Sequence, residues 1–391
     1  MKKGIRKLFA AILVGAMALG LAACGGGNPV STAPAADSGA ATAADAGEAG
    51  GLKICIITSS GVDDGSFNEN CYDGIKAFIA NHSDCTVTDV KESDLTKLIS
   101  TVESLVGDYD VFVLPGFNFA GCGEIAQANP DKKFLVVDST ITDSEGNQMT
   151  LDNVYTMTFQ EEQGGFLAGV AAALTSQTGK VAVVNGIAFP SNVNYQFGFM
   201  SGVNYSNAKF GTNVECVEIA AYAGQATVEV QGMGTNVGGN YVGDFADEAT
   251  GKTVAEALIS QGCDVIFPAA GSSGNGCFTA IKETKGVYGI GCDVDQYDDG
   301  VNGSSNIILT SVLKGMDVYI EEQLGKIYDG TFEGKDDTLG ATGYVNAEGR
   351  QQLSEDAIAK LDEVFEAMKA GEIVPASNFN GYLPTDFPGL K

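Results

Sequence analysis

One cysteine stands in a context that predicts covalent chemistry. Cys24 ends the run LAAC at residues 21–24, which has the pattern that lipoprotein signal peptidase recognises. Four basic side chains within residues 2–7 and an apolar run over residues 8–21 precede it, and that run is too short to span a bilayer. We therefore expect residues 1–23 to be a lipoprotein signal peptide. Its removal would leave Cys24 to be lipidated and would anchor the chain to the cell membrane, facing the extracytoplasmic side.

The residues that follow Cys24 favour a flexible tether. Residues 25–51 are almost entirely Gly, Ala, Ser, Thr, Pro, Asp and Glu, and Val30 is their only bulky apolar residue. Such a segment cannot bury enough surface to offset the conformational entropy that it would lose on ordering. We predict that residues 24–51 form a lipidated linker to a folded body that begins at Leu52.

Two glycine-rich segments contain the residue types, but not the spacing, of phosphate-binding loops. The run GKT at residues 251–253 resembles the end of such a loop, but the loop's first glycine would have to occupy position 246, which is Ala246. The run GSSGNG at residues 271–276 lacks the GxGxxG spacing of a dinucleotide loop. The amides of a helix start at that place could still contact a ligand oxygen.

Patterns for catalysis and metal binding are incomplete as well. His82 is the only histidine, and Asn275 interrupts a GxSxG motif, so a Ser-His-Asp triad is not expected. The run DVDQYDDG at residues 293–300 resembles part of a calcium loop, but its glycine and terminal glutamate do not stand where that loop needs them. We expect no catalytic residues, no metal and no cofactor.

Alternating apolar runs and amphipathic stretches predict an α/β fold built from parallel, doubly wound sheets. Short apolar runs bounded by turn residues are typical of buried parallel strands. The expected strands are LKICIITS, DVFVLPG, KKFLVVDS, GKVAVVNG, CDVIFPAAG and GVYGIGCD. The expected helices cover residues 70–81, 95–106, 119–128, 161–176 and 252–261. In such folds ligands bind beyond the carboxyl ends of the strands, so that is where the site should lie.

The length of the body predicts two lobes with a cleft between them, because single cores stop growing at about 250–300 residues. We expect lobe one to comprise residues 52–157 and 306–330, and lobe two to comprise residues 158–305 and 331–391. The chain would then cross between the lobes three times and form a hinge. Small molecules often bind in clefts of this kind.

The net charge argues against nucleic acid as a partner. It is −28 for the whole chain and becomes −32 without residues 1–23, because these carry four basic and no acidic side chains. Binding to a phosphate backbone requires clustered Lys and Arg. The eight cysteines after Cys24 stand singly, several in apolar runs, as Cys55 and Cys263 do. This spacing indicates small buried residues rather than a disulfide framework.

Several motifs, in order along the whole body, resemble those of the basic membrane protein family, the nucleoside-binding lipoproteins of ABC importers. The similar segments are DDGSFNENCYDGI at 63–75, KKFLVVD at 132–138, VYTMTFQEEQGGFLAGVAAAL at 154–174, the stretch 241–276 with FADEATGK and GCDVIFPAAGSSGNG, and YGIGCDVDQY followed by ILTSVLKGMDVYI. The resemblance implies the two-lobed type I periplasmic-binding fold, a nucleoside ligand with purine favoured, and an ABC permease as partner. Glu248 departs from the family's usual proline, and residues 223–240 look like an insertion.

The resemblance implies a sugar-binding role for Asp138, Asp293 and Lys314. The two aspartates each end a predicted strand, one in each lobe, and Lys314 follows the run ILTSV. An ionised carboxylate is a strong, oriented acceptor for sugar hydroxyls, and the ammonium is a donor.

A nucleobase requires flat apolar faces and partners for its polar edge. Phe67, Tyr72 and Phe245 are candidates for stacking, and Asp64 and Asn68 for the edge of the base. We expect Gly116, Phe117 and Gly271 to shape the cleft walls, although tight turns would explain the glycines equally well.

Two other classes of function stay open at this stage. One is a binding lipoprotein for another small polar solute, such as a sugar or an autoinducer, on the same fold. The other is a membrane-anchored nucleosidase, which would need a poised acid or a metal. Neither of these requirements is met by a complete motif in the sequence.

Overall fold

The computed structural model describes residues 51–230, 233–340, 343–378 and 380–391. The predicted signal peptide, the lipidated Cys24 and almost all of the predicted tether lie outside the described residues. Within the described part, no helix has the length and the apolar character needed to cross a membrane.

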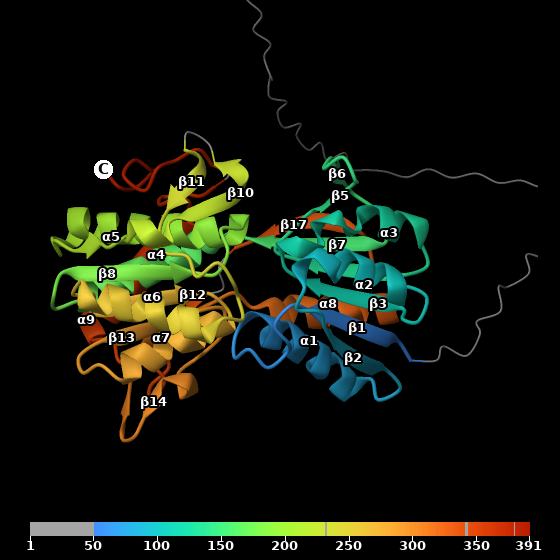
Figure 1. Cartoon of the computed structure of the whole chain (residues 1–391), viewed down its shortest axis with the longest axis horizontal. Coiled ribbons are helices and arrows are strands. Elements are labelled where there is room, and N and C mark those ends of the chain that lie inside the picture. Colours follow the sequence, from blue (N-terminus) through green and yellow to red (C-terminus); the bar gives the residue numbers. More distant parts are fainter. Residues whose placement is uncertain (1–50, 231–232, 341–342, 379) are drawn as a thin grey trace, which may run out of the picture. The chain divides into compact units, whose positions relative to one another are not determined.

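The first of two large sheets has six parallel strands. Across the sheet these are β17 (Lys335–Leu339), β7 (Val154–Phe159), β4 (Lys133–Val137), β3 (Val111–Pro115), β1 (Lys53–Thr58) and β2 (Thr86–Lys91). Alternate residues of the central strands point to opposite faces, and both faces are apolar. One face packs on α1 (Phe67–Asn81) and α8 (Met316–Tyr328), and the other on α2 (Leu98–Leu105) and α3 (Gly123–Ala128) (Figure 1).

The second sheet also has six strands, all parallel to their neighbours except β18. In order, these are β18 (Gly343–Tyr344), β16 (Ile308–Leu313), β13 (Tyr288–Gly291), β12 (Val265–Ala269), β8 (Lys180–Asn185) and β9 (Glu215–Cys216). One face is covered by α4 (Glu161–Thr175), α5 (Pro190–Phe210) and α9 (Glu355–Lys369), and the other by α6 (Glu248–Ser260) and α7 (Ser272–Lys282). The predicted fold class, α/β with parallel doubly wound sheets, is thus confirmed.

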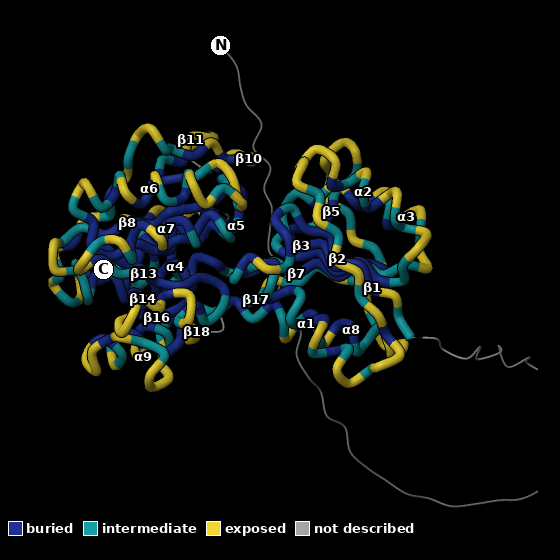
Figure 2. The backbone as a smooth tube through the Cα atoms, turned by 60° about the horizontal axis from the view of Figure 1, so that its bottom comes forward, coloured by how far each residue is buried: buried dark blue, intermediate teal, exposed yellow. Residues whose placement is uncertain are grey.

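The remaining elements are short. They are the 3₁₀ turns η1 (Leu95–Lys97), η2 (Phe117–Cys122), η3 (Ala220–Tyr222) and η4 (Asp298–Gly300), and the strands β5 (Ile141–Thr142), β6 (Gln148–Met149), β10 (Gly224–Val230), β11 (Gly234–Gly238), β14 (Val301–Asn302) and β15 (Ser305–Asn306). Strands β10 and β11 form an antiparallel hairpin within the predicted insertion. Its buried residues Ala226, Val230 and Val237 pack on α5, whereas its outer face is exposed (Figure 2).

The structure places two segments in a different lobe from the one that the sequence predicted. The division placed residues 306–330 in lobe one, but β16 lies in the second sheet. It placed residues 331–391 in lobe two, but β17 pairs with β7 in the first sheet. The chain changes sheets after β7, β16 and β17. An apolar run does not reveal which of two sheets it joins, and the run KDDTL of β17 is too polar to be recognised as a strand.

Glycines allow α4 and α5 to cross very closely. A Cβ atom on Gly165 would collide with the carbonyl oxygen of Tyr195, and one on Gly198 with the carbonyl oxygen of Glu162. This close approach brings the start of α4 beside the first half of α5, and therefore Glu161 beside Asn194. All eight cysteines in the described part are unpaired.

Candidate functional site

A cavity lies where the carboxyl ends of strands from both sheets face each other. Its lining residues include Ser59 after β1, Gly116 after β3, Asp138 after β4, Gly271 after β12 and Lys314 after β16. The empty space measures about 630 Å³, counting the part that is open to solvent.

Ten of the eleven predicted ligand-binding residues line this cavity. They are Asp64, Phe67, Asn68, Gly116, Phe117, Asp138, Phe245, Gly271, Asp293 and Lys314. Tyr72 does not line it, and its ring packs against the core beneath α1, with the Lys76 ammonium 5.1 Å from the ring centroid. The structure therefore does not bring Tyr72 to the cavity with the other ten. Phe67 and Tyr72 are five positions apart, so a helix with 3.6 residues per turn directs their side chains about 140° apart.

Lys314 is enclosed by charge and by aromatic rings. Its ammonium lies 2.7 Å from Asp138 Oδ2 and 3.2 Å from Glu161 Oε1, and all three side chains are at most 7% exposed. Burial by itself would lower the pKa of Lys314, but the carboxylates of Asp138 and Glu161 together raise it above its ordinary value. The ammonium is therefore charged at neutral pH. It also lies within 5.7 Å of three ring centroids, those of Phe67, Phe159 and Tyr195.

Asp138 retains one buried acceptor without a partner. Its Oδ2 accepts from Lys314, whereas Oδ1 is buried and has no hydrogen-bond donor among the residues that the structure describes. Burial raises the pKa of Asp138 to about 7, with Lys314 opposing and Glu161 adding to the rise. An unpaired buried oxygen costs free energy, which a ligand hydroxyl would recover by donating to it.

Asp293 is held in place by partners from both lobes. The Tyr195 hydroxyl donates to Oδ1 at 2.7 Å, and Ser66 Oγ from lobe one lies 3.4 Å from Oδ2. The amide of Lys314 donates to the Asp293 carbonyl at 3.0 Å. These contacts orient a second carboxylate toward the cavity from the opposite side to Asp138.

Asp64 holds the start of α1. Its carboxylate accepts from the amides of Ser66, Asn68 and Glu69 at 3.0–3.1 Å. Burial raises the pKa of Asp64 to about 6, although these amides oppose the rise. Both oxygens thus have partners within the protein. The neighbouring Asn68 donates to Ser60 Oγ at 2.6 Å.

Aromatic side chains from both lobes form the apolar part of the cavity. The centroid of Phe189 lies 5.3 Å from that of Phe117 and 5.9 Å from that of Phe245, with interplanar angles of 39° and 34°. Phe117 comes from η2 in lobe one, whereas Phe189 and Phe245 come from lobe two. Gly116 has φ 112°, a conformation that L side chains rarely adopt, and it directs the chain from β3 into η2.

Sequence reasoning missed about half of the lining. The missed residues are Ser59, Ser60, Pro115, Asn118, Phe189, Ser191, Asn192, Tyr195, Ala269 and Cys292. Half of them, namely Ser59, Ser60, Pro115, Ala269 and Cys292, end or follow a strand, so the rule that ligands bind at carboxyl ends of strands could have found these. Tyr195 lies in α5 and follows no strand, so its position in the sequence did not mark it as part of the site. Sequence reasoning also missed Glu161, which contacts Lys314 without lining the cavity. No group of His, Cys, Asp and Glu suited to a metal ion occurs among the residues that the structure describes.

Comparison with known proteins gives the family. A profile of the Bmp family, described as ABC transporter substrate-binding protein PnrA-like, matches residues 52–226 and 222–377, and the chain belongs to this family. The chain is 30% identical over 349 residues to the CD4+ T-cell-stimulating antigen of Listeria monocytogenes, covering 82% of this chain and 87% of that protein. It is 27% identical over 303 residues to the ABC transporter nucleoside-binding protein BmpA of Lactococcus lactis, covering 72% and 77%.

Solved structures agree on the fold. An ABC transporter solute-binding protein from Aeropyrum pernix superposes with a TM-score of 0.69 at 23% identity, over 83% of this chain and 93% of that one. A solute-binding protein from Mycobacterium smegmatis with bound glycerol gives a TM-score of 0.53 at 17% identity, over 77% and 96%. The fold is that of the type I periplasmic-binding proteins, as the sequence predicted.

Proposed function

We propose that this chain is the extracytoplasmic, lipid-anchored receptor of an ABC importer and that it binds a nucleoside between its two lobes. The observation that carries the proposal is that one cavity combines aromatic rings with carboxylates. The rings of Phe117, Phe189 and Phe245 contact one another in its lining, and the carboxylates of Asp138 and Asp293 line it as well. A nucleoside needs the same combination, because it joins a flat base to a ribose that carries hydroxyl donors.

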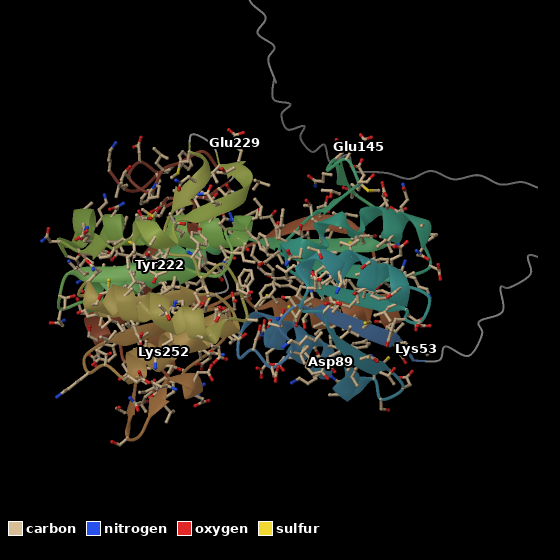
Figure 3. The ribbon with its side chains drawn as sticks, in the orientation of Figure 1. Lys53, Asp89, Glu145, Tyr222, Glu229 and Lys252 are labelled. Atoms are coloured by element: carbon tan, nitrogen blue, oxygen red, sulfur yellow. The ribbon has the colours of Figure 1, made fainter. Side chains whose placement is uncertain are left out.

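The polar part fits a ribose well. The unpaired Oδ1 of Asp138 is a ready acceptor for one hydroxyl, and the oriented Asp293 carboxylate for another. The similarity to the nucleoside-binding BmpA supports the same ligand class. A phosphorylated ligand fits less well, because the chain carries a net charge of −28 and acidic side chains such as Asp89, Glu145 and Glu229 extend from its periphery (Figure 3).

The test is a thermal-shift and calorimetry series on the purified body. Bound ligand stabilises the folded state by RT ln(1 + [L]/Kd). Inosine, guanosine, adenosine or a pyrimidine nucleoside should raise the melting temperature in a dose-dependent way, and free ribose and nucleotides should raise it less. Mass spectrometry of the denatured protein would identify any ligand that was retained during purification.

The same series separates the alternatives. If a sugar or another polar solute shifts the melting curve and no nucleoside does, the receptor assignment stands with another ligand. If chromatography finds free base accumulating with turnover, the protein is an anchored nucleosidase. Intact nucleoside after hours of incubation would agree with a receptor that releases its ligand to a permease unaltered.

A further inference from the structure

Glu161 is buried beside the cavity without lining it. It is the first residue of α4, where the chain enters the second lobe, and its side chain is 3% exposed. Its Oε1 lies 3.2 Å from the Lys314 ammonium, and its Oε2 accepts from Asn194 Nδ2 at 2.9 Å. Asn194 Oδ1 in turn accepts from the amide of Asn378 at 2.8 Å. Both oxygens of Glu161 are therefore used inside the protein, and neither is available to a solute.

The Lys314 ammonium is divided between two carboxylates from different lobes. Asp138 follows β4 of the first sheet, whereas Glu161 begins a helix of the second lobe. Rings of Phe67, Phe159 and Tyr195 surround the same ammonium. In such surroundings charges interact more strongly than in water, so the charge of Glu161 affects how strongly Lys314 neutralises Asp138.

We propose that Glu161 is a positioning residue for solute binding, which holds Lys314 between the lobes and leaves Asp138 Oδ1 free to accept from a solute hydroxyl. The proposal rests on the proposed function, because it assigns the solute's hydroxyl to Asp138. It adds a residue that never touches the solute. Without the charge of Glu161, Lys314 would pair with Asp138 alone and would weaken it as an acceptor.

The pH dependence of binding provides a signature of this arrangement. The charged and ionisable groups that interact electrostatically with Asp138 include Lys314, Glu161, Asp293 and the Cys71 thiol, and Asp64 lines the same cavity. Burial raises the pKa of Asp138, and Glu161 raises it further. Asp138 accepts from a hydroxyl best when ionised, so affinity should fall as the pH decreases through its pKa. Removing the charge of Glu161 lowers that pKa and should move the loss of affinity to lower pH.

The first experiment measures inosine affinity by calorimetry between pH 5.5 and 8.5 for wild type, Glu161→Gln and Glu162→Gln. Glu162 is a matched control, because it is the adjacent buried glutamate and lines a separate pocket with Met368 and Ile373. In Glu161→Gln the affinity at pH 8 should fall about three- to tenfold, and the midpoint of the acid loss should move down by at least about half a pH unit. The midpoint of Glu162→Gln should stay in place. An unmoved midpoint in Glu161→Gln, with the same loss at every pH, would overturn the proposal.

The second experiment needs no ligand. Melting temperatures are measured for Glu161→Gln, Asp138→Asn and the double variant, and again with Glu162→Gln in place of Glu161→Gln. Because Glu161 and Asp138 share Lys314, the melting-temperature shift of their double variant should differ from the sum of the two single shifts. For Glu162 and Asp138 the shift of the double variant should equal that sum. Additive shifts in the first pair would contradict the coupling. If wild type binds no nucleoside, the proposed function fails, and this ligand-free comparison still decides whether Glu161 acts on Asp138.

Discussion

Asp138 and Asp293 adopt the same unusual backbone conformation at equivalent places in the two lobes. Their φ angles are 61° and 69°, and Asn213 is the only other described residue besides glycine with a positive φ. Asp138 directly follows the parallel strand β4, and Asp293 stands two residues after the parallel strand β13. The left-handed conformation costs an L residue roughly 1–2 kcal/mol, although Asp and Asn tolerate it better than most. Such strain often occurs at functional sites, and here it directs two carboxylates into one cavity.

Asp293→Ala should weaken nucleoside binding by about 1.5–3 kcal/mol, because it removes a charge-assisted hydrogen bond to a sugar hydroxyl. Calorimetry measures the change. Asp89→Ala, at an exposed position on β2, is the control and should bind as wild type does. Unchanged affinity of Asp293→Ala for every nucleoside would mean that the sugar is held elsewhere or that the ligand has no sugar.

Phe117→Leu should weaken nucleoside binding by about 1 kcal/mol, because it keeps apolar volume at the cavity wall but removes a ring that faces Phe189. Competition with a labelled nucleoside measures this loss of affinity. Phe365→Leu is the control, since Phe365 packs against the core of lobe two away from the cavity. Equal losses in both variants would indicate a general effect on packing rather than contact with a base.

Asn275→Ala should destabilise the closed arrangement of the lobes. Asn275 in α7 donates to the Asp64 carbonyl in lobe one at 3.2 Å. Losing one such bond should cost about 0.5–1.5 kcal/mol, which corresponds to about a two- to tenfold faster dissociation of bound nucleoside. Stopped-flow measurement is the direct check. Thr279 lies one turn later on the same helix, and its hydroxyl donates to the Asn275 carbonyl within α7, so Thr279→Ala should leave the rate unchanged.

The difference in stability between Glu162→Gln and wild type should shift in favour of the variant as the pH rises. Burial raises the pKa of Glu162 to about 8, and Glu161 adds to the rise. A carboxyl with a raised folded-state pKa contributes stability that is complete below its unfolded pKa, about 4.3, and is lost as the pH rises to about 8. The urea midpoint of the variant relative to wild type should therefore rise between pH 5 and pH 8, by the equivalent of at least about 1 kcal/mol. The exposed control Glu103→Gln should show a constant difference.

Cys24→Ser in the full-length chain should release the protein from the membrane fraction, because the substitution removes the thiol that would carry the lipid. Fractionation of cells followed by immunoblotting measures the distribution. Cys55→Ser, at a buried position in β1, is the control for loss of a thiol. A Cys24→Ser protein that stays with the membrane would contradict lipid anchoring at this residue.

Local patterns in the sequence determined the strands and most of the site. Runs such as KKFLVVDS and CDVIFPAAG become β4 and β12 because four or five consecutive apolar residues between turns suit a strand that is buried on both faces. Asp138 and Asp293 could be found because each ends a predicted parallel strand and ligands bind beyond the carboxyl ends of such strands, whereas the role of Lys314 was implied by the family resemblance.

Only the tertiary structure decided which residues become partners. The polar β17 joins the first sheet although the strands before and after it, β16 and β18, lie in the second. Tyr72 faces the core although Phe67 faces the cavity. Glu161 shares Lys314 with Asp138 because α4 and α5 approach at their glycines and the chain crosses between lobes at that point. The contacts of Lys314 with Asp138 and Glu161 join residues more than a hundred positions apart, and no local periodicity encodes them. They arise from the way in which two lobes close on each other.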